Sequence, residues 1–434
     1  MNMRASGPDE IYRYFKQHPY ISLDSRKTQP GSLFFALRGE NFNGNQYAKQ
    51  ALELGAAYAV IDDPEYYAGE RTLLTNDVLT ALQQLAADYR NSLNIPVIGI
   101  TGTNGKTTTK ELIFTALSSK FKTYATSGNF NNHIGVPVTL LNIKPDTEIA
   151  IIEMGANHTG EIAALCKIAR PTHGLITNIG KAHLEGFGNP EGVIRAKKEL
   201  YEHLSANGGT AFVNENDILL MDLSANLPRI TYGNSGNEQY SGVLIEADPF
   251  LTVELLKPLP LLVQTRLCGG YNYSNVMAAL SIAGHFRVNL NEAATAIEAY
   301  EPKMNRSQVV HTGKNIIVLD AYNANPSSMT AAITNFSAKN PENKILVLGD
   351  MFELGTASEQ EHYSILELAI SCGFRRIITA GPEFRKVSEY ADGVLAFPSV
   401  EDLRIYLLSN PLSGENILIK GSRGMKLETI TDAL

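Results

Sequence analysis

The chain has 434 residues, of which 44% are hydrophobic and 19% charged, and its formal net charge is −8. This length exceeds one compact core and predicts roughly two to four domains. The negative balance argues against a general nucleic-acid binder, which needs a basic face to neutralise phosphates, but it leaves room for a basic pocket that binds a small anion. No stretch reaches the roughly 18–20 apolar residues of a membrane span and the first residues are too polar for a secretory signal, so we expect a cytoplasmic protein.

Residues 1–94 are predicted to form a small α/β domain. Short strand candidates, SLFFAL (32–37) and AAYAVI (56–61), are separated by a turn-rich segment. The segment DVLTALQQLAADYRNSL (77–93) places apolar side chains at the 3.6-residue helical period. A helix is therefore expected to close this domain.

Residues 95–303 are predicted to form a central domain in which apolar strands alternate with helices. The strand candidates are PVIGIT (96–101), EIAIIEM (148–154), THGLITNI (172–179) and TAFVNEN (210–216). Such alternation indicates a mainly parallel sheet with helices on both faces. In such sheets ligands bind at the carboxyl ends of the strands.

Residues 304–434 repeat the alternation and predict a third, doubly wound domain. Its strand candidates are KNIIVLDAY (314–322), NKILVLGDM (343–351), RRIITAGP (375–382) and NILIKGSRG (416–424). The expected fold class is therefore α/β, with three consecutive domains. The three cysteines lie far apart in the chain, which indicates neither a disulfide framework nor a metal site.

A glycine-rich loop follows the first strand of the central domain and is expected to open a helix near Lys106. Glycines let consecutive backbone N–H groups face an anion, and a helix N-terminus adds its positive end. Lysine would neutralise β- and γ-phosphate charge, and the threonine hydroxyl would reach Mg²⁺. The predicted ATP-binding residues of this loop are Gly102, Thr103, Asn104, Gly105, Lys106, Thr107 and Thr108.

The loop matches a short Gly-x-x-Gly-Lys-Thr form, because Ile100 stands where the strict P-loop pattern requires glycine. Phosphate binding leaves a kinase, a GTPase, an ATP-driven ligase and a mechanical ATPase open. The chain contains no Asn-Lys-x-Asp sequence that would read guanine. The remaining choice depends on the other strand ends.

Several polar residues follow predicted strands and are candidates for metal binding. Glu153 ends an apolar strand and offers a hard oxygen ligand, although it could also be an ordinary helix-start residue. His158 and Glu161 are interpreted as helix-start and capping residues rather than metal ligands. Taken alone, His183 could be a loop histidine without a role, and Lys197 would lie beside an apolar stripe with its ammonium in water.

Eight motifs occur in order and together resemble the Mur ligase family. They are GTNGKTT, SGNFNNHIGVPVTLL, EMGANHTGEI, AHLEGFG, RAKKELY, DAYNANPSSM, GDMFELG and KGSRGMKLE. The resemblance implies an N-terminal domain that binds a UDP substrate, a central ATPase-like domain with a P-loop, and a Rossmann-like C-terminal domain. It also implies ATP-dependent amide ligation with two Mg²⁺ ions.

The resemblance also implies roles for the metal candidates. Thr107 and Glu153 would hold one Mg²⁺, and Glu153, His183 and Lys197 would surround the other. For this, CO₂ would convert the Lys197 amine into a carbamate. Lys106, Lys197, Glu153 and His183 form the implied catalytic set.

The nucleotide site implied by the resemblance extends into later segments. In GGYNYSNVMAAL, Asn272 and Asn275 match an adenine-side motif, whereas Tyr271 replaces the customary histidine. Arg306 and Asp320 match positions of the third domain that close over the nucleotide, through a hinge near residues 302–304. Helix capping by the asparagines and strand-end capping by Asp320 are the alternatives.

Three pairs of residues are the candidates for substrate binding. Ser25 and Arg26 would grip UDP, and Asn131 and Asn132 would contact the diphosphate and sugar, although turns could also explain both pairs. DAYNANPSSM resembles a dipeptide-facing signature, and no Asp-Asn-Pro-Arg-like motif of the branch that adds lysine or diaminopimelate occurs. Asn323 and Asn325 would therefore lie near the incoming amine of D-Ala-D-Ala.

The implied reaction joins D-Ala-D-Ala to UDP-N-acetylmuramoyl-tripeptide through an acyl phosphate. Its products are ADP, phosphate and the UDP-muramyl-pentapeptide precursor of peptidoglycan. We expect a monomer without a nucleic-acid partner. A sibling ligase that adds another amino acid, a folylpolyglutamate-type ligase and a non-catalytic nucleotide sensor are the alternatives.

Overall fold

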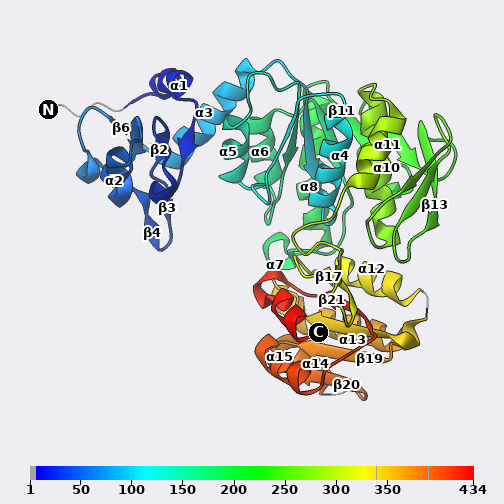
Figure 1. Ribbon diagram of the computed structural model, residues 1–434. Helices are drawn as coiled ribbons and strands as arrows, with labels where there is room; N and C mark the ends of the chain where they lie inside the picture. The colour runs from blue at the N-terminus through cyan, green and yellow to red at the C-terminus, as the bar shows by residue number, and fades with distance from the viewer. Residues whose placement is uncertain (1–5, 339, 390) are drawn as a thin grey trace.

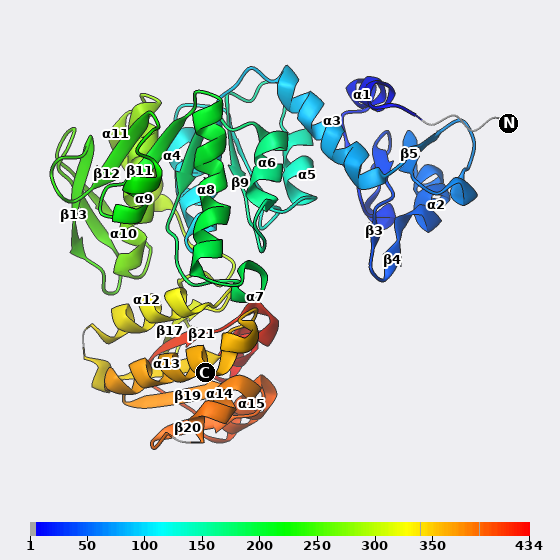
Figure 2. The same ribbon diagram turned by 180° about the vertical axis from the view of Figure 1, so that it is seen from behind.

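The computed structural model describes residues 6–338, 340–389 and 391–434. Three units follow one another along the chain, coloured blue, cyan to green, and yellow to red in Figure 1. The N-terminal unit lies to one side of the central unit and the C-terminal unit lies below it, so that the two outer units stand apart (Figures 1 and 2). The central unit therefore contacts both neighbours.

The N-terminal unit is built on a four-stranded parallel sheet with the order β1-β2-β5-β6. Its strands are β1 (Ile21–Ser22), β2 (Leu33–Phe35), β5 (Tyr58–Ile61) and β6 (Thr72–Leu74), and a hairpin joins β3 (Arg38–Gly39) to β4 (Phe42–Asn43). Its helices are α1 (Pro8–Gln17) and α2 (Ala48–Glu53). Both strand candidates of this segment are confirmed as β2 and β5.

Helix α3 (Val78–Ser92) connects the first two units. It begins after Asp77, whose carboxylate accepts a hydrogen bond from the Thr80 amide. Its buried side chains, among them Leu82 and Leu85, pack into one apolar cluster with residues of both units. The predicted helix is confirmed, and the apolar core runs without interruption from the N-terminal unit into the central one.

The central sheet has nine strands in the order β15-β14-β13-β12-β11-β10-β7-β9-β8. Strands β7 to β13 are parallel to one another, whereas β14 and β15 extend the sheet as antiparallel strands. The four predicted strands are confirmed as β7, β9, β10 and β11, and the other five were missed. The bounds are β7 (Val97–Thr101), β8 (Thr123–Ala125), β9 (Ile149–Glu153), β10 (His173–Ile176), β11 (Thr210–Asn214), β12 (Arg229–Gly233), β13 (Tyr240–Glu246), β14 (Thr252–Leu255) and β15 (Leu261–Gln264).

Helices cover both faces of the parallel part of this sheet. Alternate strand residues point to opposite faces, so that Ile98 and Ile100 join one cluster while Val97 joins the other. On the Ile98 side lie α4 (Lys106–Ser118), α10 (Tyr273–His285) and α11 (Leu290–Ala299). On the other side lie α5 (Gly135–Leu141), α6 (Glu161–Ala169) and α8 (Pro190–Ala206), and two short helices are α7 (Leu184–Phe187) and α9 (Ile218–Leu223).

The C-terminal unit has a six-stranded sheet with the order β16-β17-β21-β18-β19-β20, in which only the edge strand β16 is antiparallel to its neighbour. The strands are β16 (Gln308–His311), β17 (Ile316–Asp320), β18 (Lys344–Gly349), β19 (Arg376–Ala380), β20 (Val394–Phe397) and β21 (Asn416–Lys420). The helices are α12 (Pro326–Ser337), α13 (Ser358–Ser371), α14 (Pro382–Ser388) and α15 (Val400–Ser409). Four of these strands were predicted.

The predicted α/β fold class with three consecutive units is confirmed. In the described part of the chain, no helix combines the length and the apolar character that a membrane span requires. The cysteines Cys166, Cys268 and Cys372 are free thiols, and the first two are buried. The limits of the three domains at residues 94 and 303 stay predictions.

Candidate active site

The glycine-rich loop joins β7 to α4 as the sequence predicts, and its backbone conformation depends on two glycines. Gly102 has φ +146° and Gly105 has φ +79°. A Cβ atom at Gly102 would lie 2.0 Å from the Thr177 hydroxyl oxygen. Glycine is therefore required where the loop passes under the neighbouring strand end.

Residues after β10 hold this loop in place. The Thr103 hydroxyl and the Gly180 backbone exchange hydrogen bonds of 3.0 and 3.2 Å. The amide of Asn104 donates to the Asn178 side chain at 3.0 Å, and the Thr177 hydroxyl donates to the Asn104 carbonyl at 2.6 Å. These contacts fix the cradle before any ligand binds.

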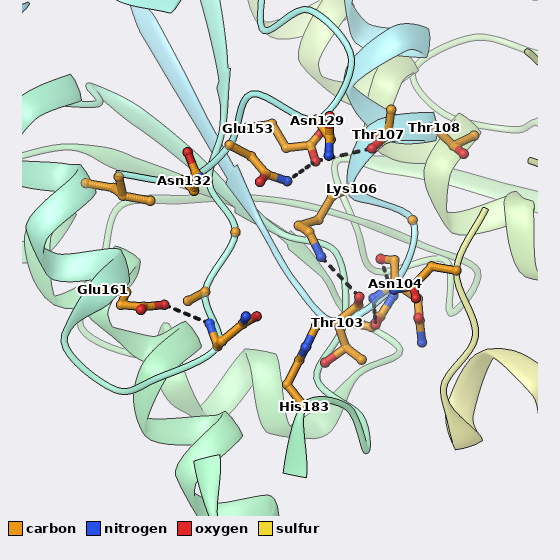
Figure 3. A pocket seen from close by; sticks show the side chains of 18 of the residues that line it. Thr103, Asn104, Lys106, Thr107, Thr108, Asn129, Asn132, Glu153, Glu161 and His183 are labelled. Atoms are coloured by element: carbon orange, nitrogen blue, oxygen red, sulfur yellow. Dashed lines mark hydrogen bonds between the residues drawn. The ribbon is translucent and has the colours of Figure 1, made fainter. Parts of the chain in front are cut away.

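Lys106 is the first residue of α4, and its side chain bends back over the loop (Figure 3). Its ammonium donates to the carbonyls of Gly102 at 2.6 Å and Thr103 at 3.1 Å. Burial lowers the pKa of Lys106, a shift that the charge of Glu153 opposes and that of Arg306 adds to. The ammonium thus lies within electrostatic reach of both the carboxylate and the guanidinium.

Glu153 ends β9 with a side chain that is almost completely buried, at 1% exposure. Its Oε1 accepts hydrogen bonds from the Thr107 hydroxyl at 3.2 Å and the Asn131 amide at 2.8 Å. Among the described residues, its Oε2 has no hydrogen-bond partner. A buried carboxylate oxygen left free beside a threonine hydroxyl fits a hard cation such as Mg²⁺.

His183 reaches the cavity in a left-handed backbone conformation, with φ +49°. Its Nδ1 lies against the carboxylate of Glu353 in the C-terminal unit, and this contact lowers the pKa of Glu353 while burial opposes the shift. In the described residues, no three His, Cys, Asp or Glu side chains form a group that could hold a metal. The second metal set therefore stays a prediction.

Lys197 is 2% exposed, so the interpretation that its ammonium reaches water is wrong. Phe187 of α7 covers the amine, with its ring centroid 5.4 Å from Nζ. No hydrogen bond or ion pair to Nζ occurs in the described part of the chain. Burial lowers the pKa of Lys197 to about 7, with the charge of Lys106 as a second cause.

A cavity of about 1200 Å³ is lined by side chains from all three units. Gly102, Lys197 and Asn325 do not line it, and neither do Ser25 and Arg26. The predicted site residues on its wall are Thr103, Asn104, Gly105, Lys106, Thr107, Thr108, Asn131, Asn132, Glu153, His183, Asn272, Asn275, Arg306, Asp320 and Asn323. The structure therefore brings most of the predicted site together.

The two adenine-side asparagines form a buried hydrogen-bond chain behind the cradle. Asn275 accepts from the Thr109 hydroxyl at 2.9 Å and donates to Asn272 at 2.8 Å, and Asn272 donates to the Cys268 carbonyl at 2.7 Å. Neither side chain caps α10. The alternative that these asparagines cap the helix is therefore wrong. The hydrogen bonds instead hold Asn275 directly against Gly105.

Arg306 and Asp320 reach the cavity from the C-terminal unit. The Arg306 guanidinium carbon lies 3.7 Å from the centroid of the Tyr322 ring, and its buried Nε has no hydrogen-bond partner among the described residues. Asp320 accepts from Lys420 Nζ at 2.6 Å and from the Ser307 amide at 3.1 Å. A guanidinium held by stacking can offer its donors to an anion.

Tyr271, which replaces the customary histidine, lies between the central and C-terminal units. Its hydroxyl and that of Ser307 share a hydrogen bond of 2.7 Å. Burial raises its pKa. The residue thus ties the adenine-side segment to the start of β16.

The asparagines predicted to bind substrate have structural contacts of their own. Asn132 accepts from the amides of Ile134 and Gly135, as a turn former does. Asn325 caps α12 through Ser328, and its Nδ2 donates to Asn104 Oδ1 at 2.8 Å across the two units. In this arrangement, Asn325 holds the phosphate loop rather than lining the cavity.

Two predictions concern residues outside the cavity. Ser25 donates to the Gln50 side chain at 2.9 Å, and Arg26 pairs with Asp24 at the exposed surface of the N-terminal unit. Their role in binding UDP stays a prediction. Glu161 is the first residue of α6, as predicted, but its carboxylate accepts from the amides of Asn157 and His158, which precede the helix. The amides of Gly160 and Ala163 at the start of α6 donate instead to Glu199.

The residues around the site that the sequence interpretation missed include Lys110, Asn178, Tyr322 and Lys420. Asn178 and Lys420 follow or end β-strands, which is the signal that identified Glu153 and Asp320. Lys110 lies one helical turn after Lys106, so it faces the same side of α4. Only Tyr322, whose role depends on stacking against Arg306, gave no signal of its own.

Family models match three successive parts of the sequence. They are described as "Mur ligase family, catalytic domain" over residues 19–90, "Mur ligase middle domain" over residues 100–283, and "Mur ligase, glutamate ligase domain" over residues 305–423. Together they cover most of the chain.

Individual proteins match over almost the whole length. The UDP-N-acetylmuramoyl-tripeptide--D-alanyl-D-alanine ligase of Bacillus subtilis is 35% identical over 95% of this chain and 92% of its own. The crystal structure of MurF from Acinetobacter baumannii superposes with a TM-score of 0.87 at 31% identity, covering 95% and 92% of the two chains. MurF ligase from Thermotoga maritima in complex with ADP gives a TM-score of 0.84 at 25% identity, covering 95% and 96%.

Proposed function

The chain belongs to the Mur ligase family of ATP-dependent ligases, and we propose that it joins D-Ala-D-Ala to UDP-N-acetylmuramoyl-tripeptide. One observation carries the proposal: the phosphate loop, the half-free carboxylate of Glu153 and the stacked guanidinium of Arg306 face one cavity. Such a site suits the reaction of two anions. The product would be the UDP-muramyl-pentapeptide precursor of peptidoglycan.

The chemistry proceeds in two steps. A carboxylate oxygen of the tripeptide attacks the γ-phosphorus of ATP, so that an acyl phosphate forms and ADP leaves. The D-Ala-D-Ala amine then attacks the acyl carbon, phosphate leaves, and the amine loses a proton. Lys106 and the loop amides offset the repulsion between carboxylate and phosphate and hold both in line.

Mg²⁺ fits the site at Thr107 and Glu153, where it would lower the repulsion between the two reacting anions. A second ion requires another anionic ligand, and the buried Lys197 amine can supply one. With its pKa near 7, a large fraction is neutral and can attack CO₂, which forms an N–C bond and releases a proton. We propose this carbamate, together with Glu153 and His183, as the second set of ligands.

The substrates are assigned to the three units as follows. Residues 1–94 would bind UDP through Ser25 and Arg26, residues 95–303 would bind ATP, and residues 304–434 would bind the dipeptide near Asn323 and Asn325. Side chains of α3, including Gln83 and Gln84, line the cavity on the side of the N-terminal unit. This wall offers an extended muramyl peptide a path from that unit to the phosphate loop.

The test is a phosphate-release assay with ATP, UDP-N-acetylmuramoyl-tripeptide and a panel of amino acids and dipeptides. We expect release with D-Ala-D-Ala and none with single amino acids or glutamate. Release with another acceptor would identify a sibling or folylpolyglutamate-type ligase. ATP binding without release under any acceptor would indicate a nucleotide sensor.

The same preparation tests two further parts of the proposal. We propose a cytoplasmic monomer, for which size-exclusion chromatography with light scattering should give a mass near 47.4 kDa. Omission of the UDP substrate should abolish release, because the acyl phosphate cannot form. A measured mass of twice this value would show that the protein is a dimer rather than a monomer.

A further inference from the structure

Lys110 is a completely buried lysine that the mechanism above does not use. It lies in the second turn of α4, and its side chain has 0% exposure. Its ammonium donates to the carbonyl of Thr126 at 2.6 Å and approaches that of Gly128 at 3.4 Å. It also pairs with Glu111 at 2.9 Å.

The segment that Lys110 holds, residues 126–131, is the segment that holds Glu153. The Thr126 hydroxyl accepts a hydrogen bond from the Glu153 amide at 3.0 Å. At the other end of the segment, Asn131 donates to Glu153 Oε1 at 2.8 Å. Lys110 therefore acts on the carboxylate through the intervening backbone.

The direct distance between the two charges supports this indirect role. Nζ of Lys110 lies 3.9 Å from Glu153 Oε2, which is too long for a hydrogen bond. The ammonium instead donates hydrogen bonds to the carbonyls of Thr126 and Gly128 and pairs with Glu111. Oε2 is thereby left free, while Oε1 is fixed by Thr107 and Asn131.

Burial of an ammonium is costly unless its donors are satisfied, so its presence at this place needs a reason. Replacement of Lys110 by an apolar side chain would leave the Thr126 carbonyl without its short hydrogen bond. The segment could then relax, and the amide of Asn131 would move relative to Glu153.

We propose that Lys110 is a positioning residue that holds segment 126–131 so that Glu153 presents its free oxygen to a divalent cation. The inference rests on the proposed function in one respect, the role of Glu153 as a metal ligand. Lys110 itself does not line the cavity.

A purely electrostatic role would have the opposite sign. A positive charge 3.9 Å from the ligand oxygen repels a cation, so its removal alone should tighten metal binding. A positioning role predicts weaker binding when Lys110 is removed, because loss of groups that orient a ligand typically costs about 10–100-fold in metal affinity. The direction of the change therefore distinguishes the two roles.

The experiment measures Mn²⁺ binding to the full-length protein with saturating ADP, by the electron paramagnetic resonance signal of free Mn²⁺. We expect Lys110→Met to weaken Mn²⁺ binding about tenfold or more and Glu153→Gln to weaken it at least as much. Lys110→Gln, which keeps a donor without a charge, should lose less. Lys120→Met is the matched control, because Lys120 follows the same helix but donates to exposed carbonyls of Phe286 and Arg287.

Metal-free ADP binding should be the same in all four variants. Unchanged or tighter Mn²⁺ binding in Lys110→Met would overturn the proposal. Normal binding in Glu153→Gln would instead overturn the metal site of the proposed function, whatever Lys110 does.

A second measurement needs no metal. Hydrogen exchange at the Glu153 amide, which donates to Thr126, should accelerate in Lys110→Met and stay unchanged in Lys120→Met. If Lys110→Met does not fold, Lys110→Gln must still show weaker Mn²⁺ binding and faster exchange. An unchanged Lys110→Gln would then overturn the proposal.

Discussion

The central unit is joined to its two neighbours by different kinds of contact. Towards the N-terminal unit, α3 inserts Leu82 and Leu85 into an apolar cluster that both units share. Towards the C-terminal unit, the contacts are polar: Asn325 bonds to Asn104, and Lys181 bonds to Glu361 at 2.8 Å. One junction resembles the interior of a domain and the other a reversible interface.

The backbone at the polar junction supports the same distinction. Met304, Asn305 and Ser307 all have positive φ, between 48° and 59°, at the point where the chain enters the C-terminal unit. Such conformations are unfavourable for residues other than glycine and cluster at active sites, ligand clamps and switch regions. We infer that the C-terminal unit opens and closes about this hinge while the N-terminal unit stays fixed to the central one.

The largest expected effect concerns the cavity itself, where the two junctions meet. Lys106→Ala should lower the rate of phosphate release by about 10³-fold or more, since it removes the charge that offsets the repulsion between two anions. Stability should change little, because the bonds that the ammonium makes within the described residues go to carbonyls of its own loop. Steady-state kinetics and urea unfolding of the same preparation measure both effects. Retention of most of the activity would falsify the mechanism.

The apolar junction predicts the next largest effect. Leu82→Ala removes a side chain with 0% exposure from the shared cluster, and it should reduce the free energy of unfolding by about 2–5 kcal/mol. Leu408→Ala is the control, because that leucine of α15 is 56% exposed and should matter by less than about 0.5 kcal/mol. Urea unfolding measures both. A separate early transition of the N-terminal unit in the wild type would show that the core is not shared.

A smaller effect is expected at Lys197, which lies beneath α7 beside the polar junction. Its pKa of about 7 means that the amine becomes neutral as the pH rises through 7, and only the neutral amine reacts with CO₂. At constant dissolved CO₂, reactivation of CO₂-depleted enzyme should therefore be about tenfold faster at pH 8 than at pH 6. Lys198→Met, at an adjacent half-buried lysine that pairs with Glu202, should behave as the wild type, and Lys197→Met should not reactivate. A pH-independent rate would contradict the carbamate.

Periodicity and strand-end positions predicted much of this arrangement. The apolar period of α3 predicted that Leu82 and Leu85 lie on one buried face, and the glycines before Lys106 predicted a phosphate-binding loop. Both predictions were possible because these signals are local in the sequence. The burial of Lys197 could not be predicted from a local pattern, because the Phe187 ring that covers its amine belongs to a separate helix. Side-chain exposure at such a place depends on tertiary packing.

Among the strands that were missed, β8, β15, β16 and β20 are the edges of their sheets, and they were missed for a related reason. Edge strands are short and partly exposed, as the pattern at Gln308–His311 illustrates, so they carry little of the apolar signal of a central strand. The contacts of Asn325 show the same limit for the site. Its position in a motif indicated the substrate, whereas the fold turns its amide towards Asn104.

The smallest effect tests the polar junction through the Lys181 and Glu361 pair. Lys181 is 55% exposed and Glu361 only 12%, so the pair should contribute less than about 1 kcal/mol to the free energy of unfolding. If the pair closes the C-terminal unit over the nucleotide, each alanine substitution should instead raise the KM for ATP two- to fivefold, roughly. In the double variant the two effects should not add, because either change already breaks the contact. High salt should weaken the coupling, because Lys181 is largely exposed. Additive effects on KM, or a loss of stability like that of Leu82→Ala, would show that this junction is as permanent as the apolar one.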